Sequence, residues 1–108
     1  MARTQSKGNY LEFGKYVTTE TPIALTSAGS YSSIGAGLQA DLKTFTAAEV
    51  YGLTVATAVV AENPLEVRLI EPVSTLVLEA QLDILFACYP IASVKTGMLP
   101  NAEQITVI

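Results

Sequence analysis

A glycine- and serine-rich loop is the feature of the sequence most suggestive of chemistry. It runs from Gly29 to Gly37 as GSYSSIGAG, between an apolar run and a segment with helical periodicity. Glycines let a backbone approach a ligand closely, and the helix that follows presents unpaired N–H groups to a polar or anionic group. The loop lacks the Gly-Lys-Ser/Thr ending of a Walker A loop and is no clean dinucleotide fingerprint. An ordinary strand-to-helix turn is the alternative interpretation.

Two carboxylates and a methionine follow this loop at positions where side chains can meet a ligand. Asp41 lies in the first turns of the expected helix, where the helix dipole favours a negative charge. Glu62 ends an expected buried strand, where open α/β sheets place their ligand sites, and can accept hydrogen bonds from an amine or a protonated ring nitrogen. Met98 follows Gly97 at another strand end and could pack on a flat ring. Each residue also has an ordinary structural interpretation. Asp41 could be a surface acid that complements the helix dipole, Glu62 a solvated residue at a strand end, and Met98 a side chain that fills the core.

The elements that must position these groups alternate between strands and helices. Residues 23–27 and 54–61 are apolar runs typical of strands, and the second shows so little polar alternation that we expect it to be covered on both faces. Between them, Leu38, Leu42 and Phe45 recur at the spacing of one helix face.

The second half of the sequence continues the same alternation. Strands are predicted at 67–70 and 93–96, on either side of a helix at 75–89 that Ser74 caps. This helix is apolar nearly all round, so we expect it to be largely buried. A further helix opens at 100–103. The alternation predicts an α/β fold with a parallel sheet and right-handed crossovers, and the few helices available suggest an interrupted portion of a larger fold.

Composition excludes several classes of function. The chain of 108 residues is half apolar and carries a net charge of −4. Such apolar content predicts packing against further chain or a homo-oligomer, because a small domain hides little surface. The negative charge argues against nucleic acid, and no apolar run reaches the roughly 18 residues of a membrane helix. Histidine is absent, which excludes His-based catalysis, and Cys88, the single cysteine, fits a buried thiol in a reducing cytosol.

Several segments taken together resemble one enzyme family. The segments are Ala28–Ser30 with Gly35–Phe45 (GAGLQADLKTF), Tyr51–Asn63 (YGLTVATAVVAEN), Ala80–Asp83 (AQLD) and Val94–Leu99 (VKTGML). In order and spacing they resemble the signatures of the hydroxymethylpyrimidine and phosphomethylpyrimidine kinases of thiamin biosynthesis. The resemblance covers residues 22–108, which predicts a flexible leader at 1–21 followed by the N-terminal half of a kinase domain.

The resemblance implies a ribokinase-like α/β fold, a mainly parallel sheet with flanking helices, and a cytoplasmic enzyme that is usually a homo-oligomer. The family transfers the γ-phosphate of ATP, with Mg²⁺, to 4-amino-5-hydroxymethyl-2-methylpyrimidine and then to its phosphate, and related members accept pyridoxal. Carried over position by position, the family's pyrimidine-pocket residues match Gly29, Asp41, Val60, Glu62 and Met98. An aminopyrimidine offers an amine donor and a basic ring nitrogen to such carboxylates.

Three departures from the family's pattern stand out. Tyr31 occupies the place of an acidic residue, Ile34 that of a glycine, and Thr96 that of an apolar residue. If the glycine position needs a positive φ, isoleucine would strain the loop. The family's nucleotide site, anion hole and catalytic residue lie in its C-terminal half, so the resemblance assigns no catalytic residue to this chain and no ATP or Mg²⁺ to this chain alone.

Two classes of function remain open from the sequence. One is a pyrimidine kinase chain that supplies the substrate pocket, either as a truncated form or as one part of a split enzyme that a C-terminal chain completes. The other is a non-catalytic ligand-binding or assembly module, or a degenerate fragment, derived from such a kinase. Neither the exact substrate nor the oligomeric state follows from the residues.

Overall fold

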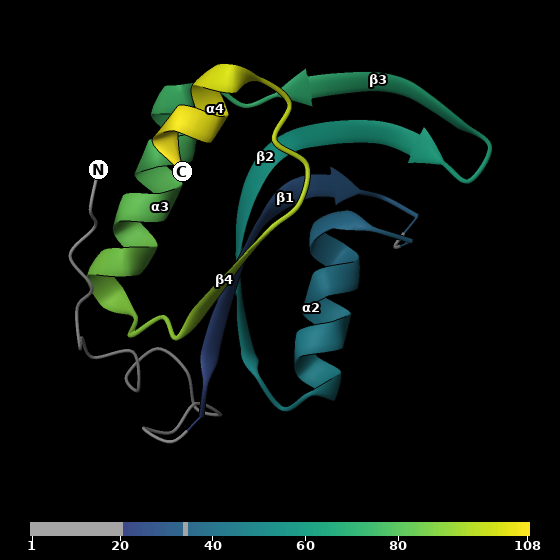
Figure 1. Cartoon of the computed structure of the whole chain (residues 1–108). Helices are drawn as coiled ribbons and strands as arrows, with labels where there is room; N and C mark the ends of the chain where they lie inside the picture. Colours follow the sequence, from purple (N-terminus) through teal and green to yellow (C-terminus); the bar gives the residue numbers. More distant parts are fainter. Residues whose placement is uncertain (1–20, 34) are drawn as a thin grey trace.

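The computed structural model describes residues 21–33 and 35–108, which form a twisted four-stranded sheet between helices (Figure 1). Nearly all of the predicted leader at 1–21, and Ile34 with its predicted strain, lie outside these residues. The elements follow the chain as β1 (Ile23–Tyr31), α2 (Gly37–Ala47), β2 (Tyr51–Asn63), β3 (Glu66–Pro72), α3 (Thr75–Cys88), β4 (Ser93–Thr96) and α4 (Ala102–Val107).

The sheet has the strand order β3-β2-β1-β4 and is mainly parallel, as predicted. Strand β1 pairs in parallel with β2 and with β4, so the carboxyl ends of these three strands meet at one edge of the sheet. Helix α2 covers one face, and α3 with α4 lies on the other (Figure 1). The core between β1, β2 and α3 contains Ile23, Leu25, Leu53, Val55, Leu78, Leu82 and Ile91.

Strand β3 does not follow the predicted parallel pattern. It runs antiparallel to β2, and the two strands form a hairpin closed by Asn63, whose Oδ1 accepts hydrogen bonds from the backbone N–H groups of Leu65 and Glu66 at 2.8 and 3.0 Å. Every residue of β3 is exposed, and Val59 on the partner strand is 61% exposed. The expectation that residues 54–61 are covered on both faces is therefore wrong beyond Ala58.

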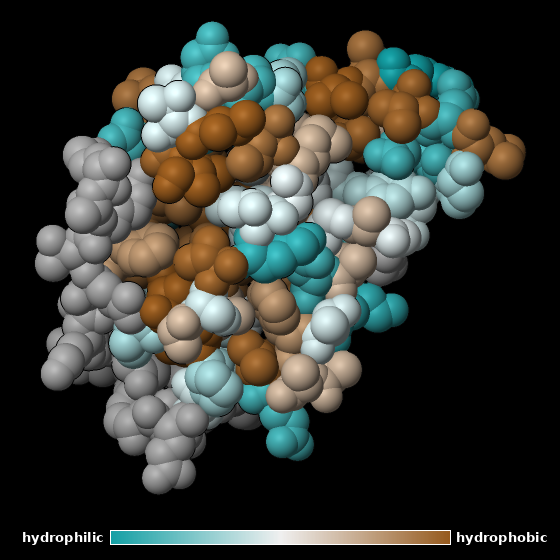
Figure 2. Space-filling view, viewed as in Figure 1, coloured by the Kyte–Doolittle hydropathy of each residue, from teal (hydrophilic) through white to brown (hydrophobic). Residues whose placement is uncertain are grey.

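Helix α3 begins as predicted but is less buried than predicted. The Oγ of Ser74 accepts a hydrogen bond from the backbone N–H of Val77 at 3.2 Å, which confirms the predicted N-cap. Only Leu78 and Leu82 are buried, whereas Leu76 is 78% exposed. Apolar side chains consequently gather on the surface over α3 and α4 (Figure 2).

Two glutamines attach the helices to the open edge of β2. Before β3 begins to pair with it, β2 carries backbone groups that none of the described strands satisfies on that side. The Gln81 side chain accepts from the backbone N–H of Ala56 at 2.9 Å and donates to its carbonyl at 3.0 Å. The fully buried Gln104 donates to the carbonyls of Thr57 and Val73. These bonds satisfy edge groups that would otherwise be costly to bury.

Candidate functional site

A cavity of about 300 Å³ opens where the carboxyl ends of β1, β2 and β4 meet. Ligand sites of open α/β sheets lie at this edge, because the loops that leave parallel strands diverge there. Backbone, aromatic, apolar and charged groups line the cavity: Gly29, Tyr31, Ala36, Gly37, Glu62, Lys95, Gly97 and Met98.

Two irregularities in strand pairing occur at residues of the cavity. The register between β1 and β2 shifts between Ala28 and Gly29, and that between β2 and β3 shifts between Ala61 and Glu62. The unpaired extra residues are Thr57 on β2 and Arg68 on β3, and an extra residue disrupts the ladder locally and increases the twist of the strand that carries it. The strand pairing is therefore irregular directly beside Gly29 and Glu62, which both line the cavity.

Gly29, Val60 and Met98 form an apolar wall. A Cβ on Gly29 would lie 3.3 Å from Val60 Cγ2 and 3.5 Å from Met98 Cε, so a side chain at this position would press into the wall. Val60 is buried behind Gly29, whereas Met98 lines the cavity itself. The backbone carbonyl of Met98 accepts a hydrogen bond from Thr57 Oγ1 at 2.7 Å, which fixes the segment after β4 against β2.

The glycine loop closes tightly onto the end of β1. Gly37 has a φ of 73°, and a Cβ there would lie 2.3 Å from the carbonyl oxygen of Gly29. The Gln39 side chain accepts from the backbone N–H of Tyr31 at 2.9 Å and donates to Ser30 Oγ at 2.8 Å. These contacts hold the first turn of α2 against β1, and they place the Tyr31 side chain, which is 8% exposed, along the cavity.

Asp41 lies beside the cavity and does not line it. Its Oδ2 accepts hydrogen bonds from Thr26 Oγ1 at 2.6 Å and from Lys95 Nζ at 2.8 Å. Burial raises the pKa of this carboxyl, but the hydrogen bonds from Lys95 and Thr26 and the charge of Lys95 together outweigh burial, so that the pKa lies below its ordinary value.

The lowered pKa of Asp41 predicts a loss of stability in acid. A group whose pKa is depressed by folding stabilises the protein above its unfolded pKa of 3.8, and that contribution disappears as the pH falls through the folded pKa. We expect the free energy of unfolding of the parent to fall more steeply below about pH 4 than that of Asp41→Asn. Urea denaturation between pH 7 and pH 3 measures this difference. If the free energy of unfolding falls equally with pH in the parent and in Asp41→Asn, the ionised Asp41 carboxylate does not contribute the expected stability.

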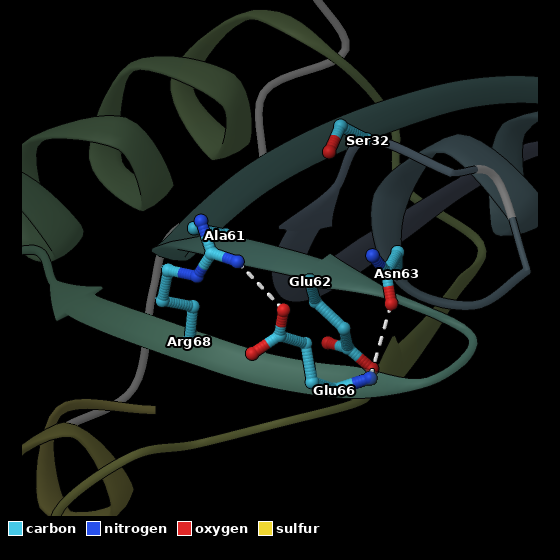
Figure 3. A pocket seen from close by; sticks show the side chains of 6 residues that line it. All are labelled: Ser32, Ala61, Glu62, Asn63, Glu66 and Arg68. Atoms are coloured by element: carbon cyan, nitrogen blue, oxygen red, sulfur yellow. Dashed lines mark hydrogen bonds and ion pairs between the residues drawn. The ribbon is translucent and has the colours of Figure 1, made fainter.

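A second hollow lies on the hairpin of β2 and β3 and shares Glu62 with the cavity (Figure 3). Three of its other polar residues are already engaged in bonds within the hairpin. Arg68 pairs with Glu66 at 2.7 Å, and Asn63 binds the turn backbone. An exposed ion pair such as Arg68–Glu66 contributes little free energy, and its two charged groups are already bound to each other. We therefore place the candidate site at the cavity between the strand ends.

The structure brings several of the predicted site residues together. Gly29, Glu62 and Met98 line the cavity, Val60 lies directly behind Gly29, and Asp41 reaches the cavity only through Lys95. Lys95 was not singled out from the sequence, where its only signal was a charge inside a short predicted strand that a glycine follows.

The geometry agrees with a comparison of the sequence with known families. Residues 32–108 match the model of the family described as phosphomethylpyrimidine kinase. The chain belongs to this family. It is 48% identical over 88 residues to the hydroxymethylpyrimidine/phosphomethylpyrimidine kinase of Rhizobium meliloti, a match that covers 82% of this chain and 33% of that protein. The chain thus spans about a third of the length of this relative, and about a sixth of the length of some longer relatives that it also matches.

Solved structures of phosphomethylpyrimidine kinase and pyridoxal kinase share the fold. The phosphomethylpyrimidine kinase of Clostridium difficile superposes with a TM-score of 0.77 at 41% identity, covering 81% of this chain and 38% of that one. The ADP complex of Bacillus subtilis pyridoxal kinase superposes with a TM-score of 0.75 at 42% identity, and the match covers 82% of this chain and 35% of that one. The ribokinase-like fold predicted from the sequence is therefore confirmed for this portion of the family's length.

Metal and membrane sites receive no support from the residues that the structure describes. Within residues 21–33 and 35–108, no three His, Cys, Asp or Glu side chains lie close enough together to hold a metal ion. In the same portion, no helix has the length and apolar character needed to cross a membrane.

Proposed function

We propose that this chain supplies the substrate pocket of a cytoplasmic kinase that phosphorylates hydroxymethylpyrimidine and its phosphate for thiamin biosynthesis. The observation that carries the proposal is the cavity at the strand ends, which combines Glu62 with Gly29 and Met98 in a chain of the phosphomethylpyrimidine kinase family. A relative from Geobacter sulfurreducens, 49% identical, is named as a bifunctional protein of thiamine biosynthesis.

Glu62 is the group that we assign to ring recognition. It is half-buried at the end of β2 and lines the cavity, and no other side chain among the described residues forms a hydrogen bond or ion pair with its carboxylate. An ionised carboxylate can accept hydrogen bonds from the exocyclic amine of an aminopyrimidine and from its ring nitrogen when that is protonated. Tyr31 and Met98 provide the apolar surface that a flat ring requires.

The proposal is tested by calorimetric titration of the chain with hydroxymethylpyrimidine. We expect Glu62→Gln to weaken binding by about tenfold or more, because it removes the charge from the acceptor. Glu66→Gln is the matched control, since Glu66 is a neighbouring carboxylate that lies outside the cavity and pairs with Arg68. Equal affinities of the parent and Glu62→Gln, or no binding by the folded parent, would contradict the proposal.

Phosphoryl transfer requires more than this pocket. The reaction depends on positioning the phosphates and stabilising their charge, normally with Mg²⁺ bridging them. Because the chain matches only about a third of the length of the related kinases, we assign ATP, Mg²⁺ and the catalytic groups to a segment that corresponds to their remaining length, whether it belongs to the same polypeptide or to a partner. A homo-oligomer remains a further prediction from the apolar surface.

A further inference from the structure

Lys95 is the cation of the candidate cavity. Its side chain is about half exposed, at 49%, and it lines the same cavity as Glu62. The ammonium lies close to Gly97, where an added Cβ would be 3.4 Å from Nζ. The charged end of Lys95 is therefore at the cavity wall, and the cavity combines one carboxylate with one ammonium.

The Lys95 ammonium is held in place by a partly buried network of hydrogen bonds. Asp41 Oδ2 accepts from Lys95 Nζ at 2.8 Å and from Thr26 Oγ1 at 2.6 Å, and Thr26 is fully buried on β1. Lysine is flexible, so an anchored carboxylate restricts the directions in which its ammonium can point. An ammonium has three donors, and Asp41 occupies one of them in the structure. The others remain able to bind a ligand in the cavity.

We propose that Lys95 is a specificity-determining residue that donates to an oxygen on the side arm of the bound ring, and that Asp41 is a positioning residue that acts through Lys95. The inference rests on the proposed function, in which Glu62 binds the ring. The ligand then has donors on one side, facing Glu62, and an oxygen acceptor on the other. The hydroxyl of a hydroxymethyl group and its phosphate ester share this acceptor chemistry.

The charge of the acceptor sets the size of the effect. A hydroxyl oxygen is a neutral acceptor, whereas a phosphate is an anion that binds an ammonium more strongly. Loss of the Lys95 charge should therefore lower the affinity for a phosphorylated ligand more than the affinity for a hydroxylated one. A ligand without the oxygen should be unaffected, because Glu62 and the apolar wall still hold its ring.

The test compares three ligands by calorimetric titration: hydroxymethylpyrimidine, its monophosphate and 4-amino-2,5-dimethylpyrimidine, which lacks the oxygen. Lys95→Met keeps most of the side-chain volume. We expect this variant to lower the affinity for hydroxymethylpyrimidine about tenfold and the affinity for the monophosphate by a larger factor. The dimethyl analogue should bind equally to both proteins. Lys95→Arg keeps the charge and should recover much of the loss for the monophosphate.

The role of Asp41 is tested in a double-variant cycle. In the parent, Asp41→Asn should lower the affinity for hydroxymethylpyrimidine and its monophosphate. In the Lys95→Met background the same substitution should cause no further loss of affinity, since the two residues act as one unit. An additive loss would overturn the positioning role. Equal losses for all three ligands, or none, would overturn the role of Lys95 while the proposed function stands. If the folded parent binds none of the ligands, the proposed function fails and this inference fails with it.

Discussion

Replacing Gly37 with alanine is expected to lower the free energy of unfolding by about 3 kcal/mol. Gly37 has a φ of 73°, and the left-handed conformation is unfavourable for alanine by about 1–2 kcal/mol. The added Cβ would also lie 2.3 Å from the carbonyl oxygen of Gly29, a distance at which the backbone must move. Gly29 pairs with Ala58 in the sheet, which resists that movement.

The same substitution should impair binding, because Gly29 and Gly37 both line the cavity. Gly35→Ala is the matched control. Its φ is not in the left-handed region, and its Cβ would meet the Tyr31 ring at 3.1 Å, where a side chain can shift by a few tenths of an ångström. Urea denaturation followed by circular dichroism measures both variants. Equal destabilisation by the two substitutions would show that the Gly37 conformation is not the cause.

The local order of the chain was predictable because it depends on neighbouring residues. The N-cap at Ser74, the bounds of β4 and the start of the last helix follow from residue types a few positions apart. The antiparallel β2–β3 hairpin was not predicted, because the residues of each run indicate a strand but not the direction in which the two strands pair. The Asn63 turn between them was the available signal, since asparagine side chains close such turns by binding the backbone two residues on.

The composition of the site was less predictable, because it depends on contacts distant in sequence. Lys95 meets Asp41 across 54 positions, through pairing of β1 with β4 and packing of α2 on the sheet. The resemblance to the kinases placed Asp41 in the pyrimidine pocket, and no periodicity could indicate that a lysine lies between that carboxylate and the cavity. The exposure of α3 was also hidden, since an apolar helix pattern does not say what covers it.

The exposed apolar surface indicates where the rest of a complete kinase would pack. Strand β4 pairs only with β1 among the described strands, so its outer edge is open, and Val94 on it is 49% exposed. Leu76 and Ile84 on α3 and Ile105 on α4 are exposed as well, which gives the apolar patch over these helices (Figure 2). Surfaces of this kind are normally covered in a folded protein.

A fusion tests whether this portion still works inside a complete kinase. Residues 22–108 replace the matching third of the Rhizobium meliloti relative, whose remaining length then covers the open edge and the apolar patch. We expect the fusion to phosphorylate hydroxymethylpyrimidine within about tenfold of that relative, and the 108-residue chain alone to be at least a thousandfold slower, because we assign the groups that position and stabilise the phosphates to the remaining length of the relative. ADP release measures both rates.

The Glu62→Gln form of the fusion separates pocket function from mere folding. It keeps the size of the side chain and the apolar interfaces, so it should fold as the fusion does while losing affinity for the pyrimidine. A fusion that folds cooperatively yet shows no activity would mean that this pocket no longer presents its substrate to the phosphates. Turnover by the isolated chain at the rate of the relative would instead place the catalytic groups within these 108 residues. An active fusion that loses affinity for the pyrimidine in its Glu62→Gln form would thus indicate a working substrate pocket, and an inactive folded fusion would indicate a fold retained without its reaction.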